Sequence, residues 1–344
     1  MMGSVTPTIH DVARLAGVSP RTVSNVVNDY VHVKPETRAR VQAAVKELNY
    51  HPNLSARRLR QGRTNILGFA VPELSQPYFA EMSELIERSA RKHGYAVMAR
   101  QTGGELAGET RALRDFTSHM VDGLIFSPMT MVHDDLVASP PAVPTVLIGE
   151  QIEHSQWPCL AIDNVAAARE VTTHLIEQGH RRIAALGAYH GSDYRNSSLR
   201  LEGYRAAVAD AGLATDEDLI IYTDKFSREA GLLGVGGALA AGLEFDAIFC
   251  FTDLLAFGAL RALADAGLKT PDDVAIASID DIEEAAYSVP SLTTIAPDKD
   301  AIVDGAVTAL LGLIAGEVDD PDSREVAYRL VLRESSQPLH RQQS

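Results

Sequence analysis

The chain has 344 residues, of which 46% are apolar and 22% charged, an ordinary composition for a soluble globular protein of two or three domains. Its two cysteines lie in apolar surroundings without CxxC spacing, which excludes a disulfide framework and a cysteine-ligated metal site. The net charge of −15 is uneven: residues 1–63 hold ten Lys and Arg against four Asp and Glu (+6), and the remainder holds 21 against 42 (−21).

This uneven charge favours DNA contact by the N-terminal part alone. A basic head can follow phosphates, whereas an acidic body is repelled from the duplex. The first ten residues lack the basic and apolar regions of a signal peptide, and the longest apolar stretch, near 307–315, is too short to span a bilayer. We therefore expect a cytoplasmic protein.

The first predicted element is a short helix that begins near Ile9. Thr8 followed three residues later by Asp11 is a capping box, in which each side chain satisfies a free amide at the start of the helix. Apolar residues then recur at helical spacing as far as Gly17, which lacks a Cβ and so favours a left-handed helix end. The pattern predicts a short helix followed by a turn.

A second short helix follows, because Ser19 is a preferred N-cap and Pro20 occupies the first helical position, where its missing amide costs nothing. Two such helices form either a helix-turn-helix or an ordinary helical hairpin with a polar face. We favour the former, because Arg suits the edge of guanine, Asn suits that of adenine, and Ser and Thr hydroxyls hold phosphates. The residues predicted to contact DNA here are Thr8, Ser19, Arg21, Thr22, Ser24 and Asn25.

A third helix opens at Pro35 and closes a helix-turn-helix domain of residues 1–49, after which residues 50–64 form a linker rich in Arg. The linker can nucleate a single helix, which by itself is marginal in water. Packing against a symmetric partner in the minor groove could order it, and Leu59 is then placed to wedge between base steps. The alternative is a solvated basic linker in which Leu59 is incidental.

From residue 65 the pattern changes to alternating strands and helices. Short apolar runs are separated by helical stretches such as 78–93, 164–179, 195–212 and 253–266, which predicts parallel sheets covered on both faces. A body of this length is large for one sheet and suits two similar lobes. The fold class is therefore α/β, with an N-terminal three-helix head. The apolar runs are ILGFAV, YAVMAR, DGLIFS, TVLIG, CLAI, RIAALG, AIFCF and VAIASI.

Ligands of open parallel sheets bind beyond the carboxyl ends of the strands, so polar and aromatic residues just after the apolar runs are candidates for a binding site. Carboxylates that accept hydroxyls, Arg donors and aromatic rings suit a small polyhydroxy compound or a comparable polar ring. Asp253 is equally well explained as a helix cap, and Phe226 as a core residue. The candidates are Tyr78, Phe79, Asp163, Arg195, Arg200, Phe226, Asp253 and Asp280.

Several of these stretches together resemble the lactose-repressor-type (LacI) family of transcriptional regulators. The resemblance covers almost the whole chain. It implies a hinge helix in which Asn53, Arg57 and Leu59 contact DNA, a homodimer on a palindromic operator, and effector contacts by Asp163, Arg200 and Asp280 and by the ring of Phe226. The stretches that carry the resemblance are Asp11-Val12-Ala13, Ala16-Gly17-Val18-Ser19, Thr22-Val23-Ser24, Val26-Val27-Asn28, Tyr50-His51-Pro52-Asn53 and Ala56-Arg57-Arg58-Leu59.

The resemblance also implies a periplasmic-binding-protein-like body over residues 65–344. Its lobes would exchange strands at crossovers near Asp163, Ser291 and Asp322. The N-lobe would then hold about 65–163 and 292–322, and the C-lobe about 164–291 and 323–340. Thr252 stands where the family usually has Asn, and Ser278-Ile279 replaces a usual Gly-aromatic pair, so the identity of the effector stays open.

Three classes of function compete. The first is a DNA-binding regulator, a repressor, controlled by a small polar effector such as a sugar bound between the lobes. The second is an extracytoplasmic solute-binding protein, against which the basic head and the missing signal peptide argue. The third is an α/β enzyme, but no GxGxxG, P-loop, GxSxG or HExxH motif is present, so we expect neither catalysis nor a cofactor nor a metal. The sequence leaves open the operator and whether the effector releases or promotes DNA binding.

Overall fold

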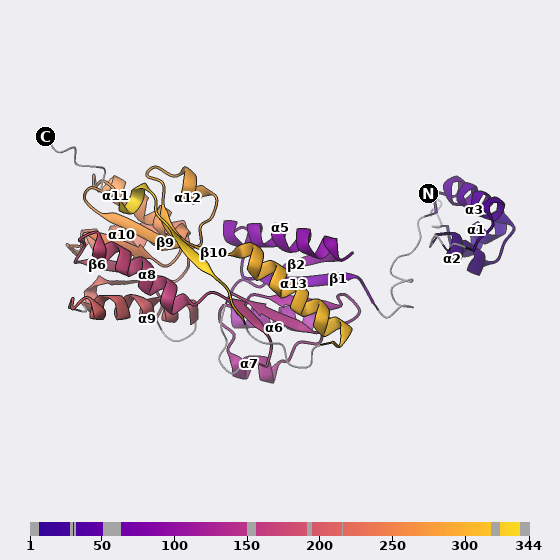
Figure 1. Cartoon of the computed structure of the whole chain (residues 1–344), viewed down its shortest axis with the longest axis horizontal. Coiled ribbons are helices and arrows are strands. Elements are labelled where there is room, and N and C mark those ends of the chain that lie inside the picture. Colours follow the sequence, from indigo (N-terminus) through magenta and orange to yellow (C-terminus); the bar gives the residue numbers. More distant parts are fainter. Residues whose placement is uncertain are drawn as a thin grey trace, which may run out of the picture. The chain divides into compact units, whose positions relative to one another are not determined.

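The computed structural model describes residues 7–27, 30, 32–50, 63–149, 156–190, 195–214, 216–317 and 324–337. The chain divides into two units, residues 1–64 and residues 65–344 (Figure 1). The hinge positions Asn53, Arg57 and Leu59 lie outside the described residues. Within the described part, no helix combines the length and the apolar character needed to cross a lipid bilayer.

The first unit is a three-helix head, in which the helix caps predicted from the sequence are present. The predicted capping box is present: the Thr8 amide donates to Asp11 Oδ2 at 2.9 Å, and the Asp11 amide donates to Thr8 Oγ1 at 3.4 Å. Gly17 ends the first helix with a left-handed φ of 63°. The Thr22 amide donates to Ser19 Oγ at 3.1 Å, so Ser19 caps the second helix. The helices are α1 (Ile9–Ala16), α2 (Pro20–Val27) and α3 (Pro35–Glu47).

A small aliphatic core holds these three helices together. One side of each helix supplies buried side chains to a single cluster. The outer side of α2 stays free of that cluster. The buried members of the head core are Val12, Ala13, Ala16, Val23, Val26, Val41 and Ala44.

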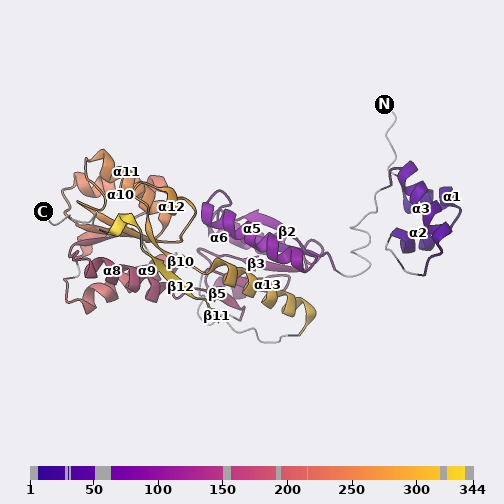
Figure 2. The ribbon, with the colours of Figure 1, turned by 45° about the horizontal axis from the view of Figure 1, so that its top comes forward.

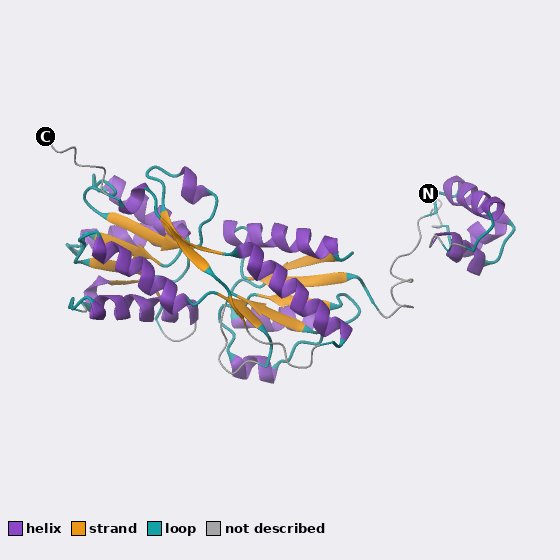
Figure 3. Ribbon diagram, viewed as in Figure 1, coloured by secondary structure: helices purple, strands orange, loops and turns teal. Residues whose placement is uncertain are grey.

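The second unit begins with a lobe built on a six-stranded sheet, here called sheet A, in the order β11-β5-β4-β3-β1-β2. All its strand pairs are parallel. Side chains alternate between its faces: Phe69 packs toward α5 and α13, whereas Phe126 packs toward α6 and α7. Figure 3 shows helices on both faces of the sheets. The strands of sheet A are β1 (Ile66–Val71), β2 (Ala96–Gln101), β3 (Gly123–Phe126), β4 (Thr145–Ile148), β5 (Cys159–Ala161) and β11 (Arg324–Glu325). Its helices are α5 (Pro77–Lys92), α6 (Leu106–Asp115), α7 (His133–Ala138) and α13 (Lys299–Ala315).

The other lobe is built on sheet B, in the order β12-β10-β9-β8-β6-β7. Its pairs are parallel except that β12 runs antiparallel to β10. Helix pairs α8–α9 and α10–α11 cover the two faces (Figure 2). The strands are β6 (Ile183–Ala188), β7 (Ile220–Tyr222), β8 (Ala247–Cys250), β9 (Ala275–Ile279), β10 (Thr293–Pro297) and β12 (Tyr328–Val331). The helices are α8 (Asn164–Glu177), α9 (Arg195–Asp210), α10 (Arg228–Ala240), α11 (Asp253–Asp265) and α12 (Glu284–Tyr287), with 3-10 turns at Glu217–Leu219 and Glu334–Ser336.

Among the described residues the chain passes three times between the lobes. It leaves sheet A after β5, returns after β10, and leaves again between β11 and β12. Two passages come later in the chain than the positions expected near Ser291 and Asp322, because β10 pairs with β9 in sheet B and β11 pairs with β5 in sheet A. No local periodicity tells which of two parallel sheets a strand joins.

Candidate functional site

The head presents polar side chains at the N-terminal end of α2. Arg21 and Ser19 are exposed, and Thr22, Ser24 and Asn25 are half-buried. Ser19 also serves the helix itself, since its Oγ lies 2.9 Å from Thr22 Oγ1. Arg21 is therefore the long cationic side chain on this end of the helix.

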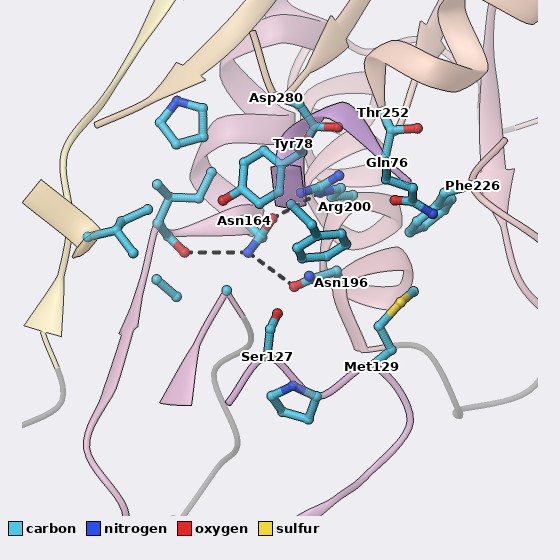
Figure 4. Close-up of a pocket in the computed structure, with 17 residues that line it drawn as sticks. Gln76, Tyr78, Ser127, Met129, Asn164, Asn196, Arg200, Phe226, Thr252 and Asp280 are labelled. Carbon is cyan, nitrogen blue, oxygen red and sulfur yellow. Dashed lines mark hydrogen bonds between the residues drawn. The ribbon is translucent and has the colours of Figure 1, made fainter. Parts of the chain in front are cut away.

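The body holds a cavity of about 720 Å³, counting its solvent-open mouth, at the carboxyl ends of the strands of both sheets. Its mix of apolar and polar walls is that of a small-molecule site. Figure 4 shows side chains of both lobes pointing into the same space. The lining residues are Gln76, Tyr78, Phe79, Ser127, Pro128, Met129, Gly149, Ala161, Ile162, Asn164, Asn196, Arg200, Phe226, Thr252, Asp280, Pro297 and Ile302.

Asp280, the carboxylate that lines the cavity, sits on a strained stretch of backbone just after β9. Its φ is 132° and that of Asp281 is 46°, both in the left-handed region that side chains other than Gly rarely adopt. Such strain persists only where surrounding contacts enforce it, and it concentrates at functional sites. Burial raises the pKa of Asp280, while the positive charges of Arg200 and Lys299 lower it.

Asp253 lies beneath the cavity and does not line it, contrary to its predicted role as an effector contact. Its carboxyl is fully buried and accepts hydrogen bonds from Ser278 Oγ at 2.5 Å, Thr294 Oγ1 at 2.7 Å and the Ile282 amide at 2.9 Å. Burial, followed by the charge of Asp280, raises its pKa. Its bonds hold both sides of the strained turn, so Asp253 positions Asp280.

Arg200 supplies the cation of the cavity from a buried position on α9. Its Nε donates to Asn164 Oδ1 at 2.9 Å, and its Nη1 donates to the carbonyl of Phe251. Asn164 Nδ2 in turn lies 3.3 Å from Asn196 Oδ1 (Figure 4). These bonds fix the guanidinium at one wall, where it and the Asn196 amide can donate to ring or hydroxyl oxygens.

The opposite wall depends on a buried carboxylate of α6. Glu109 is fully buried, and its Oε1 accepts from the Met129 amide at 2.6 Å. Its Oε2 accepts from Thr130 Oγ1 at 3.0 Å and from the Met131 amide at 2.9 Å. Burial raises the pKa of Glu109 despite these bonds. The segment thus held carries Met129 into the cavity.

Five of the residues predicted from the sequence meet in the cavity: Tyr78, Phe79, Arg200, Phe226 and Asp280. Three do not line it. Asp163 caps α8 through a 2.9 Å bond from the Ala166 amide, Arg195 begins α9 half-buried, and Asp253 lies below.

Sequence reasoning missed Asn164, Asn196 and the loop with Ser127 and Met129. Asn164 stands beside the predicted Asp163, and the signal for Ser127 was its place directly after a strand. Nothing in the helix sequence LAGETRALRD distinguishes Glu109 from a solvent-facing glutamate.

Two sequence families match the chain. Residues 8–53 match the bacterial regulatory proteins of the lacI family, and residues 172–336 match a periplasmic binding protein-like domain. The ribose operon repressor of Escherichia coli K12 is 34% identical over 307 residues, which cover 88% of this chain and 92% of that protein.

Solved structures of full-length relatives are similar as well. The lac repressor dimer bound to operator and the anti-inducer ONPF matches with a TM-score of 0.85 and 26% identity, covering 96% of this chain and 99% of that one. The complex of the transcriptional regulator CelR with cellobiose matches with a TM-score of 0.71 and 30% identity, with the same coverage of 96% and 99%.

Proposed function

Since the chain belongs to the LacI family of bacterial regulatory proteins, we propose that it is a DNA-binding transcriptional repressor controlled by a small polar effector. It acts as a homodimer on a palindromic operator. Residues 1–49 contact the DNA, and residues 65–344 bind the effector and the partner subunit. Residues 50–64 connect these two domains. Since its target is chromosomal DNA, it works in the cytoplasm.

One observation carries this proposal. A single chain joins a helix-turn-helix head, with an exposed arginine on its second helix, to a two-lobed body with a cavity lined by both lobes. A solute-binding protein needs only the body, so the head argues against that alternative. We infer that the site binds its ligand without transforming it.

The effector class is argued from the cavity walls. Asp280 accepts hydroxyl hydrogens, Arg200 and Asn196 donate to oxygens, and Phe226 offers an apolar face. A sugar or a related polyhydroxylated metabolite presents both kinds of surface. The named ligand of one relative, cellobiose, belongs to this class.

The mechanism follows from where the cavity lies. Both lobes contribute walls, so a ligand that binds one arrangement of the lobes better shifts the population toward it. In a dimer this alters the separation of the two heads and so the fit to two half-sites.

DNA binding is tested by selecting duplexes from a randomised pool with the full chain. We expect enrichment of one palindromic sequence, bound at least 1000-fold (about 4 kcal/mol) more tightly than scrambled DNA at the same salt. Enrichment of no sequence would refute sequence-specific regulation.

The effector is sought by thermal unfolding of the full chain with pentoses, hexoses, disaccharides and purine bases. A true effector raises the melting temperature in a concentration-dependent way and changes operator affinity. A purine hit would replace the sugar class, and stabilisation without any change in operator binding would contradict effector control.

A further inference from the structure

Lys299 places a buried ammonium where the two lobes meet. It is the first residue of α13, directly after the second passage between the lobes, and only 7% of it is exposed. Its Nζ donates to Glu81 Oε2 on α5 at 2.5 Å and to the carbonyl of Asp281 at 2.9 Å. Helices α5 and α13 lie side by side in the lobe of sheet A (Figures 1 and 2), whereas Asp281 belongs to the lobe of sheet B. One side chain therefore hydrogen-bonds across the lobes.

Burial makes this contact sensitive to the arrangement of the lobes. A buried ammonium needs its acceptors, because water cannot readily replace one that moves away. Besides these two acceptors, the ring of Tyr78 lies 5.4 Å from Nζ. A rotation that carries Asp281 away leaves Lys299 without one of its two hydrogen-bond acceptors. The arrangement with the contact formed is thus favoured.

The same contact reaches the strained turn that carries Asp280. Asp281 is held at its carbonyl by Lys299 and at its carboxylate by Arg333, at 2.7 Å, and the Arg333 Nη1 donates to the Leu292 carbonyl at 2.8 Å. Asp280 also feels the charge of Lys299, which lowers its pKa. Tyr78 lines the cavity and lies beside the ammonium. Asp280 and Tyr78, which both line the cavity, therefore lie beside the inter-lobe contact between Lys299 and Asp281.

We propose that Lys299 is a positioning residue that orients the Asp280 turn and biases the two lobes toward the arrangement in which it binds Asp281. Binding of a ligand to Asp280 then changes the strength of the hydrogen bond between Lys299 and the Asp281 carbonyl. Only the effect of a ligand on this hydrogen bond rests on the proposed effector function. The preference for one arrangement of the lobes is a property of the ligand-free chain.

A matched control exists on the same pair of helices. Arg88 on α5 bonds to Asp300 on α13 at 2.8 Å, but their side chains are 55% and 72% exposed. Neither residue contacts the other lobe in any described interaction. Removing this pair disturbs α5 and α13 without touching the bond across the lobes.

The test measures the distance between the lobes in the full chain without DNA or ligand. Spin labels at Glu105→Cys and Asp224→Cys follow the carboxyl ends of the edge strands β2 and β7, and both positions are exposed. The buried Cys159 and Cys250 are replaced by Ala, and labelled subunits are diluted with unlabelled chain. We expect one narrow distance distribution in this parent protein. Lys299→Met should add a second, longer population of at least a tenth of the molecules, and Arg88→Met should match the parent.

Two results would overturn the proposal. One is a Lys299→Met distribution identical to that of the parent, and the other is an equal change in Arg88→Met. Lys299→Arg, which keeps a cation with several donors, should stay close to the parent. If Lys299→Met does not fold, Lys299→Gln decides, because its shorter neutral side chain cannot reproduce both bonds and should broaden the distribution in the same direction. Since neither DNA nor effector is used, failure here leaves the DNA-binding proposal intact.

Discussion

Asp253 is a buried acid with no cation of the described residues within ion-pair distance, and this predicts an unusual dependence of stability on pH. Its pKa is raised by burial and by Asp280, so the folded state holds the proton more tightly than the unfolded state, where the pKa is near 4. The folded state is then favoured at low pH, and that advantage is lost as the pH rises from about 4 toward 7. Asp253→Asn removes this loss, since its amide can donate to the Ser278 and Thr294 hydroxyls while its oxygen accepts from Ile282.

We expect Asp253→Asn to match or exceed the parent in free energy of unfolding at pH 8, by up to about 1–2 kcal/mol. Its stability should fall less between pH 5 and pH 8, as urea unfolding at several pH values would measure. Asp253→Ala is the contrasting variant, because it strands three donors and should cost about 1–3 kcal/mol. A parent whose stability rises over this pH range would refute the assignment.

Asp280 is the carboxylate we expect an effector to meet. Asp280→Asn keeps the shape of the side chain but removes the charge that strengthens hydrogen bonds from hydroxyls. Affinity for the effector should fall by about 1.5–3 kcal/mol, or 10- to 100-fold, in calorimetry, with effector-free operator binding unchanged. Asp163→Asn is the control, since Asp163 caps α8 outside the cavity and Asn is an equally good cap. Equal losses in both variants would remove Asp280 from the site.

Arg21 is the exposed cation at the start of α2. Arg21→Ala should weaken binding to the selected operator by about 1–3 kcal/mol, the usual worth of a bidentate base contact, and leave non-specific binding nearly unchanged. Fluorescence anisotropy on operator and scrambled duplexes at matched salt separates the two. Arg14→Ala is a control on α1, because Arg14 is exposed and paired with Asp11. A loss of the same size on both duplexes would make Arg21 a phosphate contact.

Among the elements, α6 fixes the wall of the cavity through Glu109. Glu109→Gln turns one acceptor oxygen into an NH₂ group that faces amide donors of residues 129–131. We expect a loss of about 1–3 kcal/mol in unfolding free energy and faster amide exchange at Met129 and Met131. Glu105→Gln on the same helix is the control, because Glu105 is exposed and makes no capping bond. Unchanged exchange in residues 129–131 would contradict this role.

The elements were largely predictable because their signals are local. The capping box at Thr8, the left-handed Gly17 and the apolar strand runs all act within a few residues. The second and third passages between the lobes come later than expected, because β10 and β11 pair with strands through contacts distant in sequence.

The site was only half predictable for a related reason. Aromatic and charged residues just beyond strand ends were found, such as Arg200 and Asp280, because strand ends converge on ligands. Asp163 and Asn164 show the limit. The two residues are adjacent at the start of α8. The Asp163 carboxylate accepts the capping hydrogen bond from the Ala166 amide, whereas Asn164 lines the cavity. Which of two adjacent residues lines the cavity depends on tertiary packing, which the local sequence does not reveal.

At the scale of the whole molecule, the uneven charge assigns DNA contact to the head and the linker. Residues 1–63 carry +6 while the remainder carries −21, so only the N-terminal part gains from the phosphates. The body then controls affinity through geometry alone. Whatever couples the two must act in residues 50–64.

Leu59 is the apolar side chain of this linker that we propose to reach the DNA. Unstacking a base step costs a few kcal/mol, so it occurs only where the inserted side chain and the closer fit of the bent duplex to the protein offset that cost. Leu59→Ala should therefore reduce both affinity for the palindromic operator and the bend of the DNA. The body's melting temperature and effector binding should not change. The loss should be largest where the central step is hard to kink, as gel-shift bending assays on operators that differ only at the centre would measure. If parent and variant bind and bend these operators alike, the linker is a tether, and control of the half-sites must pass through the spacing of the heads alone.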